Sequence, residues 1–289
     1  MCTYIEHTSW KSKVEQITPD AAYLTDDQHG NHNEVPLPGK EYFQVDAKSC
    51  SSVSSACFGE AVLSEQPNFQ PITTFYVAAK GIGIVRFPIP SSELEISIYH
   101  NDRTLAYMST RGKCSSGDAV LSHPKLGDLD STTYFFGPGR DPVMKLLQGP
   151  YEAESDKNIL KIQGKWTSHS VAFWSPEGRL FQWGYCCRKE ANMGKVKLMV
   201  LRLKEPSTME DGREGRVLAQ LIRSDETRTQ GSSKSSAGNG GQLMLDEHAT
   251  EYLDEALIVA TCLVMLKKEI DRRRFAQFAV LGGIAAGGL

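Results

Sequence analysis

The sequence has no apolar run long enough to cross a bilayer. Its longest apolar stretch, residues 256–266, has eleven residues, which is about 16 Å of helix at roughly 1.5 Å per residue. A hydrocarbon core of about 30 Å needs about 20 such residues. The N-terminal residues MCTYIEHTSWKSK also lack the basic and apolar regions of a signal peptide. We therefore expect a cytoplasmic protein with no transmembrane helix, at most peripheral at a membrane.

A regular cysteine pattern is missing as well. The seven cysteines make an odd count without a framework of repeated spacings. Cys186 and Cys187 are adjacent, so in a strand their side chains point to opposite faces and cannot share a metal ion. Cys262 lies inside the apolar stretch and is interpreted as a buried thiol. This usage is typical of a reducing, intracellular compartment.

No motif names a reaction. The sequence GIGIV, residues 81–85, lacks the third glycine of a dinucleotide-binding loop. His29 and His32 are spaced like metal ligands, but their surroundings offer no further ligands. His169 lies between two serines on a predicted strand, where neighbours point to opposite faces. We therefore expect no enzyme, no catalytic residue, no metal and no cofactor; the alternative is an active site assembled from residues far apart in the sequence.

Arginine is absent from residues 1–71, and the charge of this segment is strongly negative. It holds four Lys against ten acidic residues, a net charge of −6. The segment is polar without sustained periodicity, which predicts a partly irregular N-terminal arm. Residues 72–205 hold 18 basic and 13 acidic residues, a net charge of +5. This asymmetry favours an anionic partner for the second region.

From Ile72 the sequence is typical of β-structure. In SELEISIYHNDRTLAYMSTR, apolar residues alternate with polar ones on both sides of the turn HNDR, which predicts a hairpin. Val171 and Phe173 share one face, SPEG is a turn, and Phe181, Trp183 and Tyr185 return on one face. We expect nine to twelve antiparallel strands in a sandwich or barrel, with a flexible loop at residues 224–242.

One helix is predicted after these strands. Thr250 is a candidate N-cap, Asp254 and Glu255 suit the first turn, and Arg272–Arg274 suit the last. Since the stretch is apolar all round, the helix belongs in the interior, surrounded by sheet. We expect it to bury the side chains of Leu257, Ile258, Ala260, Thr261, Val264 and Met265. The apolar, glycine-rich tail 275–289 is interpreted as packed or irregular, with a membrane anchor as the alternative.

These features together resemble a known superfamily. A many-stranded barrel closed around an apolar C-terminal helix is the plan of the tubby C-terminal, LURP-one and phospholipid-scramblase superfamily. Residues 72–274 resemble a fungal-type tubby-like member in ELEISIYHNDRTLAYMSTR, TTYFFGPGRDP, GKWTSHSVAFWSPEGRLFQWGYC and DEALIVATCLVMLKKEIDRRR. The resemblance implies an antiparallel β-barrel that binds phosphoinositides at a basic surface, without carrying any site residue over.

A candidate surface follows from the residues themselves. Between Lys157 and Lys204 there are ten basic residues and only two acids. Phosphate recognition requires convergent cations. The candidate ligand-binding residues are Lys161, Lys165, Arg188, Lys189, Lys195 and Lys197; alternatively they alternate outward along strands as solvated charges.

Two functions remain open from the sequence. The first is a non-enzymatic domain that binds anionic membrane lipid. The second is a protein-interaction module that recruits its partner through the N-terminal arm or through loop 224–242. No nucleic acid partner is expected.

Overall fold

A computed structural model describes the fold over residues 69–84, 93–113, 116–134, 140–148, 156–164, 168–190, 194–204 and 215–286; the side chains of residues 187–190, 194–197 and 281–286 lie outside this description. All of these residues belong to one unit, Cys57–Leu289. The prediction for the N-terminal arm therefore concerns residues outside the described part.

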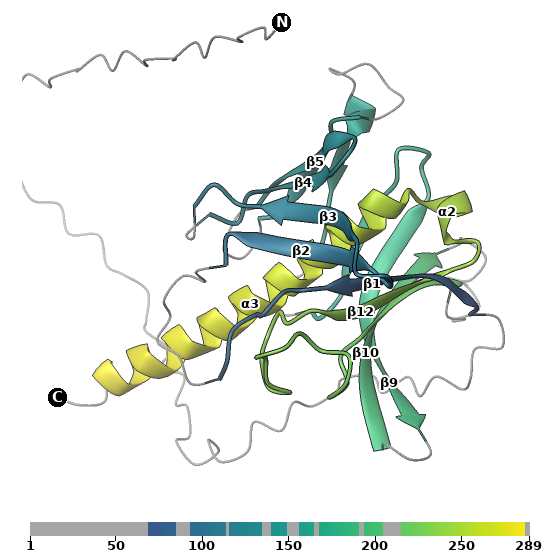
Figure 1. Cartoon of the computed structure of the whole chain (residues 1–289). Coiled ribbons are helices and arrows are strands. Elements are labelled where there is room, and N and C mark those ends of the chain that lie inside the picture. Colours follow the sequence, from purple (N-terminus) through teal and green to yellow (C-terminus); the bar gives the residue numbers. More distant parts are fainter. Residues whose placement is uncertain are drawn as a thin grey trace, which may run out of the picture. The chain divides into compact units, whose positions relative to one another are not determined.

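Twelve antiparallel strands form one sheet (Figure 1). Their bounds are β1 Pro71–Val77, β2 Glu95–His100, β3 Leu105–Thr110, β4 Ala119–His123, β5 Gly127–Thr133, β6 Val143–Leu146, β7 Ile159–Lys161, β8 Val171–Trp174, β9 Leu180–Glu190, β10 Gly194–Lys204, β11 Val217–Ile222 and β12 Gly241–Asp246. A 3₁₀ turn, η1 (Asp156–Asn158), precedes β7. Two helices follow the strands: α2 (Ala249–Tyr252) and α3 (Glu255–Ala286).

The sheet curls into a nearly closed barrel. Its order is β7-β6-β5-β4-β3-β2-β1-β12-β11-β10-β9-β8. Adjacent strands of the sheet are therefore consecutive in the chain, with one exception. The exception is the junction where β1 pairs with β12. The two edge strands meet through a bridge in which Gln163 and Ala172 exchange both backbone hydrogen bonds, at 2.8 and 2.7 Å. The predicted antiparallel barrel of nine to twelve strands is confirmed.

The predicted hairpins are also confirmed. Ile98 lies opposite Tyr107 in the pair β2–β3, and both side chains are buried. In the pair β8–β9, Phe173 lies opposite Phe181 with stacked rings 5.5 Å apart. Alternation places these residues on the inner face, because successive side chains of a strand point to opposite faces.

Strand β10 departs from simple alternation. Its inner-face residues Met199 and Leu201 join the main core, but the outer-face residues Leu198 and Val200 are buried too. Phe69, two residues before the start of β1, packs against this second, outer cluster. Both faces of the strand are therefore covered, which explains the near-continuous apolar sequence LMVL.

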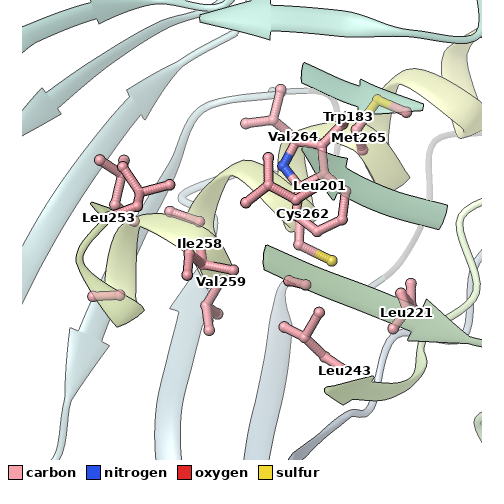
Figure 2. Close-up of a cluster of buried hydrophobic side chains, with 14 of the residues drawn as sticks. Trp183, Leu201, Leu221, Leu243, Leu253, Ile258, Val259, Cys262, Val264 and Met265 are labelled. Carbon is pink, nitrogen blue, oxygen red and sulfur yellow. The ribbon is translucent and has the colours of Figure 1, made fainter. Parts of the chain in front are cut away.

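Helix α3 lies inside the barrel over its first half (Figures 1 and 2). All six residues predicted to be buried there are buried. The indole N–H of Trp183 donates a hydrogen bond to Thr261 Oγ1 at 3.0 Å. This bond satisfies the one polar atom of a fully buried indole and ties the helix to β9.

Both predicted ends of the helix are wrong. Asp254, not Thr250, caps α3: its carboxylate accepts the N–H of Ala256 at 2.9 Å, because the extended backbone of Leu253 separates α2 from α3. The last turn is not Arg272–Arg274, since α3 continues to Ala286. The tail has no proline to stop the helix, and alanine favours its continuation. No described helix is long and apolar enough to cross a membrane.

The loop before β12 is bonded to the barrel. Thr229 Oγ1 donates to the carbonyl of Val77 at 3.1 Å, and Ile82 forms a bridge with Ala237. These contacts place residues 229–239 against the strands and beside α3. The predicted flexibility of residues 224–242 is not tested by them and stays a prediction.

A candidate basic site at the end of the barrel helix

The composition of α3 changes abruptly where its apolar stretch ends. After Leu266 the sequence KKEIDRRR carries five basic residues and two acids over Lys267–Arg274, which we call the basic segment. These residues lie where burial of the helix falls, from complete at Asp271 to exposed at Phe275. The helix therefore brings charged residues to one end of the barrel.

The negative charge of Glu269 is balanced by an ion pair inside the protein. Its carboxylate accepts two hydrogen bonds from Arg223, at 2.8 and 2.9 Å, and one from the backbone N–H of Gly238 at 2.7 Å. The Tyr185 hydroxyl donates to the same carboxylate. Burial opposes the charged form, but Arg223 and these donors hold the pKa of Glu269 below its usual value. These hydrogen bonds hold α3 against β9 and the end of β11.

The negative charge of Asp271 is also balanced by nearby cations. Lys267 Nζ lies 2.8 Å from its carboxylate and Arg274 lies 3.8 Å away, while Asp271 itself is fully buried. Burial lowers the pKa of Lys267, and the charge of Asp271 opposes that shift. The Lys267 ammonium also lies 5.2 Å from the ring centre of Tyr134. Two of the five bases are therefore engaged with an acid of the same helix.

The other three bases contact backbone carbonyls or lie near a more distant acid in the part of the chain that the structure describes. Arg272 donates to the carbonyl of Ser168 at 2.9 Å and Arg273 to the carbonyl of Ser235 at 3.1 Å. Burial lowers the pKa of Lys268, and the nearby charge of Asp141 opposes the shift. Within the described part of the chain, no carboxylate forms an ion pair with Lys268, Arg272 or Arg273. Their positive charge is therefore not balanced by a carboxylate of the described residues, and all three side chains are partly exposed.

Apolar side chains follow the arginines directly. Phe275, Phe278 and Val280 are 52%, 50% and 63% exposed. Ile84 is exposed too, and its backbone carbonyl accepts a hydrogen bond from Gln277 at 3.0 Å. In Figure 1 this part of α3 projects beyond the strands. We call residues 275–286 the apolar extension.

A small pocket lies between α3 and strands β2–β5. Its rim carries Glu93, Arg111 and Lys267, while most of its lining is apolar, including Leu121 and Leu263. Its volume of about 40 Å³ is room for roughly three water molecules. This volume is too small to hold a substrate.

The six residues chosen from the sequence are only partly described. Lys161 is exposed at the end of β7, and Lys165 lies outside the described residues. The register places Lys189 opposite Lys195, and Lys197 opposite Cys187, while Arg188 lies opposite Val196. Since their side chains are not described, convergence of these cations stays a prediction.

The basic segment was not among the residues chosen from the sequence. Its arginines were interpreted there as complements of the helix dipole at a helix end. The sequence nevertheless held a signal for this site, because five basic residues against two acidic ones exceed what is needed to complement a helix dipole.

Among the described residues, no group of three or more His, Cys, Asp or Glu side chains is placed to hold a metal ion. Comparison with family models, with curated proteins and with solved structures finds no match for the chain.

Proposed function

We propose that this chain is a non-enzymatic, tubby-like domain that binds anionic phospholipid surfaces, phosphoinositides among them, from the cytoplasmic side. The barrel with its C-terminal helix is compatible with the tubby plan. The observation that carries the proposal is that no carboxylate of the described residues forms an ion pair with Lys268, Arg272 or Arg273, which lie on α3 at the end of the barrel from which the helix emerges. Each basic residue near an anionic membrane contributes about 1 kcal/mol of attraction.

The internal neutralisation of the two acids supports this assignment. Glu269 and Asp271 are held by Arg223 and Lys267, so they do not repel an anionic surface at full strength. The same contacts fix the helix against the barrel, which presents the remaining cations from a rigid element. Preorganised cations lose less conformational entropy on binding than mobile ones.

The test is sedimentation with vesicles of phosphatidylcholine containing phosphatidylserine, or a phosphoinositide, at increasing salt. We expect binding to anionic vesicles that falls with salt, and about tenfold or greater loss in R272Q/R273Q. Lys145→Gln is the matched control, because Lys145 is exposed on β6. Thermal unfolding of each variant checks that the fold is kept.

Two results would contradict the proposal in different ways. Equal binding to neutral vesicles rules out an electrostatic role for the basic segment. If K161Q/K195Q/K197Q loses binding while R272Q/R273Q does not, the site lies on the strand surface chosen from the sequence.

A further inference from the structure

The apolar extension carries large side chains that are at least half exposed to solvent. From Phe275 to Leu289 the sequence contains no charged residue. The one strongly polar residue of its first turns, Gln277, is directed to the barrel, where it donates to the carbonyls of Gly83 and Ile84. Phe275, Phe278 and Val280 of the same turns are apolar and exposed.

A continuous apolar surface of this kind needs an occupant. Single exposed apolar residues are ordinary, but a contiguous patch marks a contact with a membrane or a protein. Here Phe275, Phe278 and Val280 lie within two turns of α3 at the end of the barrel, and each is at least 50% exposed. Extended helices that remain in water place polar residues along their solvent faces, and this one does not.

The neighbouring charges favour a bilayer over a protein as the occupant. Arg272 and Arg273 lie within one turn before Phe275, and among the described residues they donate hydrogen bonds to the neutral carbonyls of Ser168 and Ser235. Lipid phosphates lie directly above the acyl region, so a row of arginines followed by phenyl rings matches the order of layers in a membrane. The 12 residues of the extension span about 18 Å of helix, longer than the 5–10 Å to which interfacial helices are typically immersed.

We propose that the apolar extension inserts shallowly into the interfacial region of an anionic bilayer, with Phe275, Phe278 and Val280 among the acyl chains and Arg272 and Arg273 at the phosphates. This inference rests on the proposed function for the electrostatic contact and adds a hydrophobic contact to it. The occupant is the lipid bilayer, and a soluble headgroup alone does not satisfy the apolar surface.

The experiment combines two measurements on the full chain. Vesicle sedimentation with phosphatidylserine and phosphatidylcholine measures affinity, and the surface pressure of a monolayer of the same lipids measures insertion. The test variant is F275Q/F278Q, since glutamine is a good helix former and keeps the helix. The matched control is Leu126→Gln, because Leu126 is 61% exposed in the turn between β4 and β5.

We expect the wild type and L126Q to raise the surface pressure. F275Q/F278Q should leave the pressure unchanged and bind vesicles at least about tenfold more weakly, as expected when two half-exposed phenyl rings no longer transfer to lipid. Both positions are exposed, so the fold should be retained; circular dichroism and thermal unfolding check this.

The outcomes separate this inference from the proposed function. If F275Q/F278Q raises the pressure and binds like the wild type, the insertion is overturned, while weaker binding of R272Q/R273Q still supports the electrostatic contact. If F275Q/F278Q loses insertion but binding is insensitive to salt and to R272Q/R273Q, the insertion stands and the proposed function fails. A wild-type dimer in light scattering that F275Q/F278Q makes monomeric, with no rise in pressure, assigns the surface to a second copy and overturns the insertion.

Discussion

Asp130 shows at the residue scale how the barrel interior controls an ionisable group. It lies on β5 with its side chain almost completely buried, and one carboxylate oxygen has no hydrogen-bond partner. Burial, together with the nearby charge of Asp254, raises the pKa of Asp130 to about 7. The carboxylate is thus held in a place that favours its neutral form.

This pKa has a consequence for stability. The folded protein binds the Asp130 proton up to about pH 7, but the unfolded chain releases it near pH 4. The free energy of unfolding therefore decreases as the pH rises from about 4 to about 7. Above about pH 7 the decrease is complete. Three pH units correspond to at most about 4 kcal/mol.

We predict that Asp130→Asn raises the free energy of unfolding at pH 8 and changes it little at pH 4. Urea unfolding at the two pH values measures this difference. Asp128→Asn, at an exposed position near the start of the same strand, is the control and should not reproduce this difference between the two pH values. A gain of the same size at both pH values for D130N would show that Asp130 does not titrate as described.

At the element scale, the contact between α3 and the barrel depends on a buried ion pair. Arg223 follows β11 directly and donates two hydrogen bonds to the Glu269 carboxylate. The backbone N–H of Gly238 donates a third. Gly238 has a φ of 72° and lies against Ile270 and the carbonyl of Leu266, so a larger residue there would displace the helix. The pair therefore fixes how far along its axis α3 lies in the barrel.

We predict that Arg223→Met costs about 3–5 kcal/mol of unfolding free energy, because it leaves the Glu269 carboxylate buried without its cation. The double variant R223M/E269M should be more stable than R223M alone, since two apolar side chains replace a buried pair at lower cost. Urea unfolding in a double-mutant cycle measures the coupling. If the two substitutions prove additive, Arg223 and Glu269 do not act as a pair.

The elements also show what sequence reasoning can locate. The hairpins β2–β3 and β8–β9 were predicted because alternation and turn residues are local signals, and Ile98 and Trp183 lie where the pattern put them. The ends of α3 were not, because Thr250 is a good capping residue that the extended Leu253 disconnects from the main helix. Which residues cap a helix depends on where tertiary contacts bend the chain.

At the scale of the whole molecule, the barrel has one weak seam. Among the described residues between β7 and β8, one bridge, Gln163 with Ala172, carries the hydrogen bonds of closure. In contrast, β10 pairs with β9 over its full length and with β11 on its other side. Local opening is easiest where few backbone hydrogen bonds and little apolar contact must be given up.

We predict that the amide of Ala172 exchanges with solvent on the order of a hundredfold faster than that of Val200. Native-state hydrogen exchange followed by NMR measures both in one sample. Equal protection at the two amides would show that the barrel opens only by global unfolding.

The sequence by itself determined the class of fold. Strand alternation is a property of consecutive residues, and residues 256–266 are apolar on every side of a helix, so the antiparallel strands and the enclosed helix both followed from local chemistry. The candidate site was decided by the tertiary structure. Which cations of Lys267–Arg274 remain available depends on Arg223 and Asp271, and the exposure of Phe275 and Phe278 depends on where the barrel ends along α3. Both are relations between residues far apart in the chain, which no local pattern encodes.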